Sequence, residues 1–194
     1  MRYYLVNQCG SSIVLIGMMG AGKSSVGHCL RRRTGLDLFD VDDIVASKFG
    51  ILIPEIFSKY GEQGFREAEA EALLGLPSTQ QAIIVTGGGI VLREQNVNVL
   101  KRLGVLAWLD GNEEALFARA WQKQNRPLLQ TNDPRDAFSQ ILRARKPVYA
   151  KIADIRVDTS MLTDEEVAVA ILSKLRRVRR DRRLGSSRNC GTTP

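Results

Sequence analysis

A glycine-rich segment at residues 17–24, with the sequence GMMGAGKS, lies between an apolar run at 12–16 and a helical pattern over 22–33. It matches the pattern G-x-x-x-x-G-K-[ST], which holds nucleotide phosphates when a strand precedes it and a helix follows it. Glycines let the backbone pass close to an anion, and the N–H groups at a helix start point toward it. We therefore predict a P-loop, with a chance glycine-rich turn as the alternative. The residues expected to contact the nucleotide here are Gly20, Ala21, Gly22, Lys23, Ser24 and Ser25.

Two acids downstream can complete a phosphoryl-transfer site with this loop. Lys23 is expected beside the β and γ phosphates, and Ser24 is expected to bind Mg²⁺ through its hydroxyl. Asp40 and Asp42 follow the short apolar pair at 38–39. Positions i and i+2 of extended backbone face the same side, so one carboxylate can serve the Mg²⁺ shell while the other accepts a proton from an attacking hydroxyl. That Asp42 caps the next helix is an alternative compatible with this role.

Short apolar runs rich in Ile and Val alternate with longer segments of helical periodicity, which is typical of βαβ units around a parallel sheet. Strands are predicted at 12–16, 38–39, 82–86, 104–109 and 152–157. Helices are predicted at 22–33, 42–49, 54–74 with a break near Gly61, 93–103, 113–123, 136–150 and 164–180. The predicted fold class is α/β, as a single domain over residues 1–180. An irregular stretch at 124–133 is expected to be a mobile loop, and 181–194 a basic, disordered tail.

Three glycines follow one of the predicted strands. The run at 82–85 continues into Thr86 and then Gly87, Gly88 and Gly89, where a hydrolytic P-loop protein usually has an acid for the metal. Open parallel sheets bind ligands at the carboxyl ends of their strands, and glycines let a second substrate approach the backbone. This feature favours a kinase, and a tight turn is the alternative explanation of the glycines.

The basic excess of the chain is confined to its C-terminal end. The net charge is +7, but the region from residue 174 onward has eight Lys or Arg against one acid, which leaves 20 basic and 20 acidic residues in 1–173. A nucleic-acid-binding protein that acts through this tail is therefore a rival from a different functional class. The neutral body, which does not interleave aromatic and basic residues, makes nucleic acid an improbable partner apart from non-specific contacts of the tail.

The remaining composition bears on location. No apolar run approaches the 18 residues of a membrane-spanning helix, so the sequence predicts no membrane span. The first nine residues have no long apolar segment and do not read as a secretory signal. Cys9, Cys29 and Cys190 have no metal-site spacing and are expected to be unpaired thiols, as in a reducing compartment. We expect a cytoplasmic protein.

Six motifs, in this order and at family-like spacing, make residues 12–175 resemble the shikimate kinase family. They are the P-loop, Asp40-x-Asp42, Gly61-Glu62-Gln63-x-Phe65-Arg66-x-x-Glu69, Gly87-Gly88-Gly89, Arg126-Pro127-Leu128 and Arg145-x-Pro147-x-Tyr149. The resemblance implies a three-layer P-loop kinase fold with a five-stranded parallel sheet flanked by helices, a substrate-binding helical region at about 42–74 and a lid at about 122–135. It implies transfer of the γ-phosphoryl group of ATP to the 3-hydroxyl of shikimate, giving shikimate 3-phosphate and ADP in chorismate and aromatic amino-acid biosynthesis, with Mg²⁺ as cofactor.

The resemblance also implies roles for single residues. The catalytic residues would be Lys23, Asp42 and Arg126. Contacts to ATP outside the P-loop would come from Arg119 and Arg126, and the metal ligands would be Ser24 and Asp40. The shikimate site would consist of Asp42, Arg66, Gly87, Gly88, Gly89 and Arg145, with Phe57 and Phe65 beside the substrate or in the core. The two arginines suit a carboxylate on physical grounds, because a guanidinium fork matches a planar carboxylate and stays charged at working pH.

The chain departs from the family at one place. After Asp158-Thr159 and four further residues, the family has Arg or Lys, any residue and Pro over the adenine. This chain has Asp164-Glu165-Glu166 there instead. The contact to the base is therefore expected to depend more on Arg119.

Two alternatives remain within the P-loop class. A gluconate or other sugar-acid kinase shares the P-loop but should not need the motif at 61–69 together with Arg145-x-Pro147-x-Tyr149. A kinase-like binding module without catalysis is disfavoured by the intact Lys23, Asp42 and Arg126. The expected partners are ATP and shikimate, and the expected state is a monomer.

Overall fold

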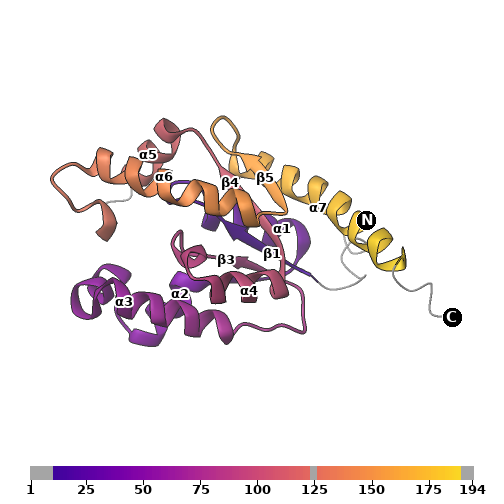
Figure 1. The fold of residues 1–194 in the computed structure, drawn as a ribbon, viewed down its shortest axis with the longest axis horizontal. Helices are drawn as coiled ribbons and strands as arrows, with labels where there is room; N and C mark the ends of the chain where they lie inside the picture. Colours follow the sequence, from indigo (N-terminus) through magenta and orange to yellow (C-terminus); the bar gives the residue numbers. More distant parts are fainter. Residues whose placement is uncertain (1–10, 123–125, 189–194) are drawn as a thin grey trace.

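The computed structural model describes the backbone of residues 11–122 and 126–188, with side chains described as far as Val178 (Figure 1). Five strands form one parallel sheet in the order β2-β3-β1-β4-β5. Their bounds are β1 Ser12–Ile16, β2 Asp37–Asp40, β3 Ala82–Val85, β4 Gly104–Asp110 and β5 Ile155–Asp158. The central β1 pairs Ile13 with Ile83 of β3 on one side and with Val105 of β4 on the other.

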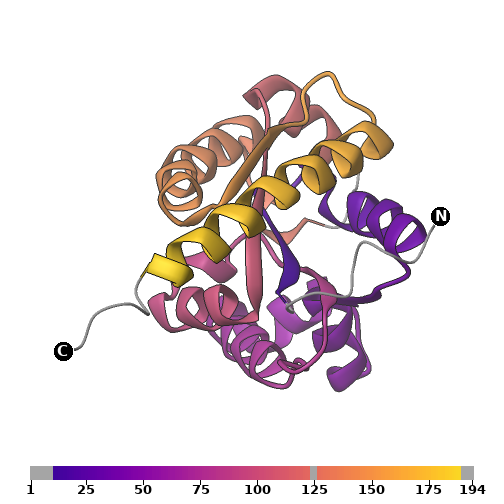
Figure 2. The same ribbon diagram turned by 90° about the vertical axis from the view of Figure 1, so that its right-hand side faces the viewer.

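Helices cover both faces of this sheet. They are α1 Lys23–Thr34, α2 Val41–Phe49, α3 Ile53–Leu74, α4 Glu94–Leu103, α5 Glu113–Trp121, α6 Pro134–Ile152 and α7 Asp164–Arg188, with 3-10 turns η1 Ile90–Leu92 and η2 Pro127–Leu129. Helices α1 and α7 pack against each other and against the sheet, and Figure 2 shows α7 crossing in front of the strands. Helices α4 and α6 contact β4. The layers confirm the α/β three-layer fold that the sequence predicts.

Burial explains why the sheet is arranged in this way. All residues of β1, β3 and β4 are buried, as the inner strands of a parallel sheet require because helices cover both their faces. In the edge strand β5, Ile155 and Val157 are buried while Arg156 and Asp158 are exposed. The main core therefore lies around the three inner strands. A smaller cluster of Val45, Ile56, Phe65 and Ala68 joins α2 to α3.

Helix α3 is kinked where the sequence predicts a break. Gly61 adopts φ 69° and ψ 178° inside it, a left-handed φ that favours glycine. The cap predicted for α5 also forms, because Asn112 accepts a hydrogen bond from the Ala115 N–H at 2.8 Å. In the same way Asp133 caps α6 through the Asp136 N–H at 2.9 Å.

Several element boundaries differ from the prediction. Helix α6 continues to Ile152, so β5 begins at Ile155 rather than at 152. The predicted irregular stretch at 124–133 contains the turn η2, and residues 123–125 lie outside the described part of the chain. Helix α7 runs to Arg188, so residues 181–188, expected in a disordered tail, are helical.

Cys29 is a buried free thiol, whereas Cys9 and Cys190 lie outside the described residues. Across residues 11–122 and 126–188, no helix has the length and apolar character that crossing a membrane would require.

Candidate active site

Many of the predicted site residues lie at the carboxyl ends of three neighbouring strands, along one edge of the sheet. The P-loop follows β1, the three glycines at 87–89 follow β3, and Asp40 is the last residue of β2. Because the strands are parallel, their carboxyl ends meet at this edge, which is where open α/β sheets bind ligands. The order β2-β3-β1 therefore places segments far apart in sequence beside one another.

The P-loop has the backbone that the motif requires. Gly20 and Gly22 have φ values of 82° and 83°, which residues other than glycine rarely adopt. A Cβ on Gly20 would lie 2.1 Å from the Leu116 carbonyl oxygen, because the loop packs directly against α5. Glycine is therefore required at Gly20 and Gly22, by backbone conformation at both and by packing against α5 at Gly20.

Lys23 is folded back over this loop. Its Nζ donates to the carbonyl oxygens of Gly17 at 2.8 Å and Met18 at 3.0 Å. Burial, followed by the nearby positive charge of Arg126, lowers the pKa of Lys23 to about 8. A bound anion would offset both effects, so the lysine is placed to respond to phosphate.

Ser24 and Asp40 lie together at the start of α1. The Ser24 hydroxyl donates to Asp40 Oδ2 at 2.9 Å, and Asp40 Oδ1 accepts from the Asp42 N–H at 3.1 Å. Asp40, not Asp42, therefore caps α2, and Asp42 lies in the first turn of that helix rather than in extended backbone. This corrects the predicted geometry of the pair, although both carboxylates still face one cavity.

These oxygens fit a magnesium ion that is bound mainly through substrate. Among the described residues, no three His, Cys, Asp or Glu side chains gather into a metal cluster. Mg²⁺ commonly takes one or two protein oxygens and completes its shell with phosphates and water. The Ser24 hydroxyl and the Asp40 carboxylate form such a donor pair, next to Lys23.

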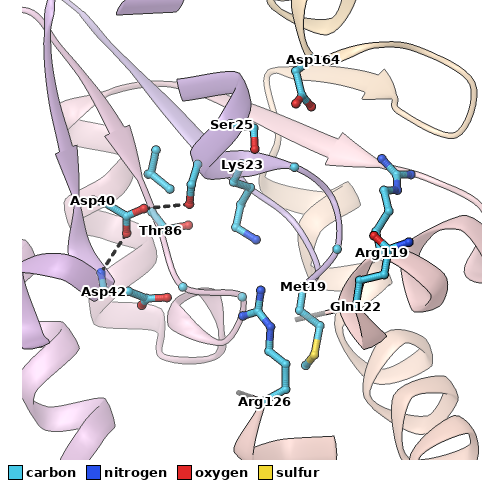
Figure 3. A pocket seen from close by; sticks show the side chains of 16 residues that line it. Met19, Lys23, Ser25, Asp40, Asp42, Thr86, Arg119, Gln122, Arg126 and Asp164 are labelled. Carbon is cyan, nitrogen blue, oxygen red and sulfur yellow. Dashed lines mark hydrogen bonds between the residues drawn. The ribbon is translucent and has the colours of Figure 1, made fainter. Parts of the chain in front are cut away.

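A cavity over the P-loop, which we call the P-loop cavity, contains most of the predicted nucleotide residues (Figure 3). Its lining is Met19, Gly20, Gly22, Lys23, Ser24, Ser25, Asp40, Asp42, Val85, Thr86, Gly87, Gly88, Arg119, Gln122, Arg126 and Asp164. Ala21 is not among them, since its side chain is buried and its N–H donates to the Met18 oxygen at 3.2 Å. Arg119 is held in place by its Nε bond to the Ala115 oxygen at 3.0 Å.

A second cavity, which we call the arginine cavity, adjoins the first. Its lining is Met19, Asp42, Leu52, Ile53, Pro54, Phe57, Phe65, Arg66, Glu69, Gly87, Gly88, Gly89, Arg126, Pro127, Leu128 and Arg145. The rings of Phe57 and Phe65 are 4.6 Å apart along its wall. Arg66 and Arg145 are only 9% and 6% exposed, so neither is a solvated surface charge.

Arg66 pairs with two carboxylates, and Arg145 lies next to a tyrosine. Arg66 donates to Glu69 Oε2 at 2.5 Å and to Glu62 Oε1 at 2.9 Å, from positions one turn away on α3. Burial raises the pKa of Glu69 to about 7 despite the positive charge of Arg66. Arg145 lies beside Tyr149, whose hydroxyl donates to the Gly88 oxygen at 2.5 Å. The cavity thus presents two guanidinium groups held from α3 and α6.

The glycines at 87–89 provide space for these side chains. None of the three has a left-handed φ, so a tight turn does not require them. A Cβ on Gly87 would lie 2.2 Å from Glu69 Oε1 and 2.8 Å from Asp42 Oδ1. A Cβ on Gly89 would lie 2.4 Å from the Arg66 guanidinium carbon. Steric exclusion therefore accounts for the absence of side chains at Gly87 and Gly89.

The two cavities meet at a small group of shared residues. Met19, Asp42, Gly87, Gly88 and Arg126 line both of them. Asp42 Oδ1 and Arg126 Nε are buried and make no hydrogen bond within the described structure. Burial, with a smaller effect of the Asp40 charge, raises the pKa of Asp42. A raised pKa makes this carboxylate a stronger proton acceptor at the junction.

Sequence reasoning assigned no site role to three residues that lie here. Glu69 and Tyr149 belong to quoted motifs, and the spacing of Arg66 and Glu69 at i and i+3 could have identified their pairing on one helix face. Asp164 lines the P-loop cavity at the position where the chain departs from the family motif. No local sequence signal says which way a carboxylate at a helix start will face.

Comparisons with known proteins identify the family to which this chain is similar. The family model described as shikimate kinase matches residues 19–176. A curated shikimate kinase from Thermodesulfovibrio yellowstonii is 43% identical over 167 residues, covering 86% of this chain and 96% of the relative. The solved shikimate kinase from Acinetobacter baumannii in complex with shikimate is 35% identical with a TM-score of 0.81, covering 84% and 92% of the two chains. That from Aquifex aeolicus is 37% identical with a TM-score of 0.74, covering 85% and 96%.

Proposed function

The chain belongs to the shikimate kinase family, and we propose that its two joined cavities carry out the ATP-dependent phosphorylation of shikimate. The observation that supports this most directly is that Met19, Asp42, Gly87, Gly88 and Arg126 line both cavities. With ATP in the P-loop cavity and shikimate in the arginine cavity, the γ-phosphoryl group and the accepting hydroxyl would meet at these five residues. Such positioning supplies much of the catalysis in phosphoryl transfer.

The P-loop cavity would bind the triphosphate. The N–H groups at the start of α1 and the Lys23 ammonium group would face the β and γ phosphates, and the bonds from Lys23 to the loop carbonyls keep it nearby. Ser24 and Asp40 would hold Mg²⁺, which, when bound, neutralises charge on the phosphate oxygens.

The arginine cavity would bind the organic acid. Arg66 and Arg145 bring two buried guanidinium groups to one wall, and a single substrate carboxylate would compensate both. Gly88, where a Cβ would find no atom closer than 3.4 Å, leaves the backbone open to the same carboxylate. With its carboxylate held by these two arginines, the shikimate ring would direct a hydroxyl toward Asp42 at the other end of the cavity.

Asp42 would accept the hydroxyl proton, and Arg126 would stabilise the group in transfer. The unpartnered Oδ1 of Asp42 supports the first role, and its raised pKa favours proton uptake. Arg126 lies close enough to Lys23 to lower the pKa of that lysine, and this proximity supports a role for both cations around the transferred phosphate. We assign Arg126 to a lid at about 122–135 that closes once ATP is bound.

A coupled assay for ADP formation tests the proposed function. Shikimate, gluconate and nucleoside monophosphates would be compared as acceptors at saturating ATP and Mg²⁺, with omission of the metal as a further arm. We expect turnover with shikimate as the acceptor and with none of the other acceptors, and we expect that turnover to be lost without Mg²⁺. Preferred turnover of gluconate would identify a sugar-acid kinase instead, and an inactive enzyme that still binds ATP would identify a binding module. The monomeric state and cytoplasmic location remain predictions.

A further inference from the structure

Three consecutive acids open helix α7, and they have different surroundings. Glu166 accepts from the Thr163 N–H and hydroxyl, both at 2.8 Å, and so completes a capping box. Glu165 bonds to the helix that follows the P-loop. The Asp164 side chain has no hydrogen bond or ion pair with any described residue, and it lines the P-loop cavity. Of the three, Asp164 is the acid that lines the P-loop cavity.

Its neighbour holds Asp164 in place relative to the P-loop. Glu165 pairs with Arg32 at 2.6 Å and with Arg33 at 2.7 Å, both on α1. Helix α1 begins at Lys23, so these ion pairs tie the start of α7 to the phosphate-binding helix. Asp164 Oδ1 lies 3.1 Å from the position that a Cβ on Gly22 would take.

The position of Asp164 indicates which part of the nucleotide it would meet. Figure 3 shows its carboxylate beyond Ser25, on the opposite side of Lys23 from Asp42, with Arg119 across the cavity. Phosphoryl transfer is proposed at the Asp42 end of the P-loop cavity, and the phosphates would lie over the P-loop. The end with Asp164 and Arg119 is therefore left for the nucleoside.

The chemistry of a carboxylate narrows the contact further. An ionised aspartate only accepts hydrogen bonds, and it would repel a phosphate placed against it. The complementary groups on a nucleoside are an exocyclic amino group of the base and the ribose hydroxyls. We propose that Asp164 determines nucleotide specificity by accepting a hydrogen bond from the nucleoside part of the phosphoryl donor. This inference rests on the proposed function, because it takes the P-loop cavity to hold ATP.

A second effect of Asp164 must be separated from this one. Any acid in the first turn stabilises a helix through the helix dipole, whatever it faces. Glu94 occupies the first turn of α4, is exposed and lines neither cavity. Glu94→Ala is therefore the matched control for the contribution of the dipole.

The test compares kcat/KM for ATP, ITP, 2′-deoxyATP and 3′-deoxyATP in the wild type, Asp164→Ala and Glu94→Ala. ITP has a keto oxygen in place of the adenine amino group, and each deoxynucleotide lacks one ribose hydroxyl. In Asp164→Ala we expect the preference for ATP over one analogue to fall about threefold to tenfold, as for loss of one partly exposed hydrogen bond. A fall against ITP identifies the amino group, and a fall against a deoxynucleotide identifies the ribose. Preferences that stay within about twofold of wild type for all three analogues overturn the proposal.

Ratios are used because removal of a negative charge near the triphosphate changes the affinity for all four nucleotides alike. Calorimetric titration with ADP, IDP and the two deoxyADP analogues gives the same preferences without an acceptor substrate. If the wild type did not phosphorylate shikimate, the proposed function would fail while these titrations still tested Asp164. Asp164→Asn, which keeps the side-chain shape, replaces the alanine variant if the latter unfolds. In Asp164→Asn the preference for ATP over the identified analogue should fall in part. An unchanged preference in this variant counts against the proposal.

Discussion

Arg66 Nη1 lies 2.5 Å from Oε2 of Glu69, and this ion pair is buried on one face of α3. The Glu69 side chain is fully buried, whereas Glu62, the other partner of the same guanidinium, is half exposed. One arginine therefore has a buried and a solvated carboxylate partner. The buried one fixes its direction toward the arginine cavity.

We expect Glu69→Ala to lower the free energy of unfolding far more than Glu62→Ala does. A hydrogen bond to a buried charge contributes roughly 1.5–3 kcal/mol, while an exposed pair contributes below about 1 kcal/mol. The free energy of unfolding at pH 8, where Glu69 with its pKa of about 7 is mostly ionised, measures the difference. In the same variant, kcat/KM for shikimate should fall at least about tenfold because Arg66 loses its orientation. Equal losses in both variants would show that Glu69 does not position Arg66.

The carboxylate site should require guanidinium groups and not merely positive charge. Arg66→Lys or Arg145→Lys keeps the charge but cannot match both carboxylate oxygens. Loss of such a charge-assisted fork should cost roughly 1.5–3 kcal/mol, or about one to two decades in kcat/KM for shikimate. Arg143→Lys, an exposed residue of α6 close to Arg145 in sequence, is the control. Full activity of both cavity variants would exclude the clamp.

Much of the fold follows from local pattern, because apolar residues recur with clear strand or helix periodicity and the P-loop marks the first βα turn. The predicted start of β5 was wrong by three residues, since Ile152 fits the apolar pattern of either element. The reason for the glycines at 87–89 was not predictable locally. At Gly87 and Gly89 the space of a Cβ is taken by Glu69, Asp42 and Arg66, which come from other elements.

Gly87→Ala tests that steric argument. The added methyl would overlap Glu69 Oε1 at 2.2 Å and press on Asp42 Oδ1 at 2.8 Å, so one of the two carboxylates must move. We expect kcat/KM for shikimate to fall at least about tenfold, the cost of misplacing a reacting group. In Gly75→Ala the added methyl finds no atom closer than 3.6 Å, and activity should be unchanged. Wild-type activity of the Gly87 variant would mean that Glu69 and Asp42 can accommodate the added methyl group, and would contradict the steric argument.

Nucleotide affinity should depend on pH through Lys23. The pKa of this lysine is about 8 in the free protein, and bound phosphates favour its charged form. Below pH 8 it is protonated with or without nucleotide, so affinity stays constant. Above pH 8 binding must take up a proton, so the Kd for ADP should rise by up to about tenfold per pH unit toward pH 9.5. Titrations from pH 7 to 9.5 measure this slope, and Lys23→Arg, which stays charged, should abolish it. A flat wild-type profile would contradict the role of this lysine.

The sharpest test of the junction between the cavities is Asp42→Asn. Asparagine keeps the size and one acceptor oxygen but loses the charge and nearly all basicity. General-base assistance is typically worth about 10² to 10⁴-fold, so kcat should fall at least about 10²-fold. ATP should still bind, because Lys23 and the P-loop are unchanged, and the fold should survive because Asp40 caps α2. Asp43→Asn changes the adjacent exposed carboxylate and should leave turnover near wild type. The measurements are turnover at saturating ATP and shikimate and nucleotide titration of the same proteins. A fall in kcat of less than about fivefold would reduce Asp42 to a positioning residue, and the proton would then leave through the transferred phosphate itself.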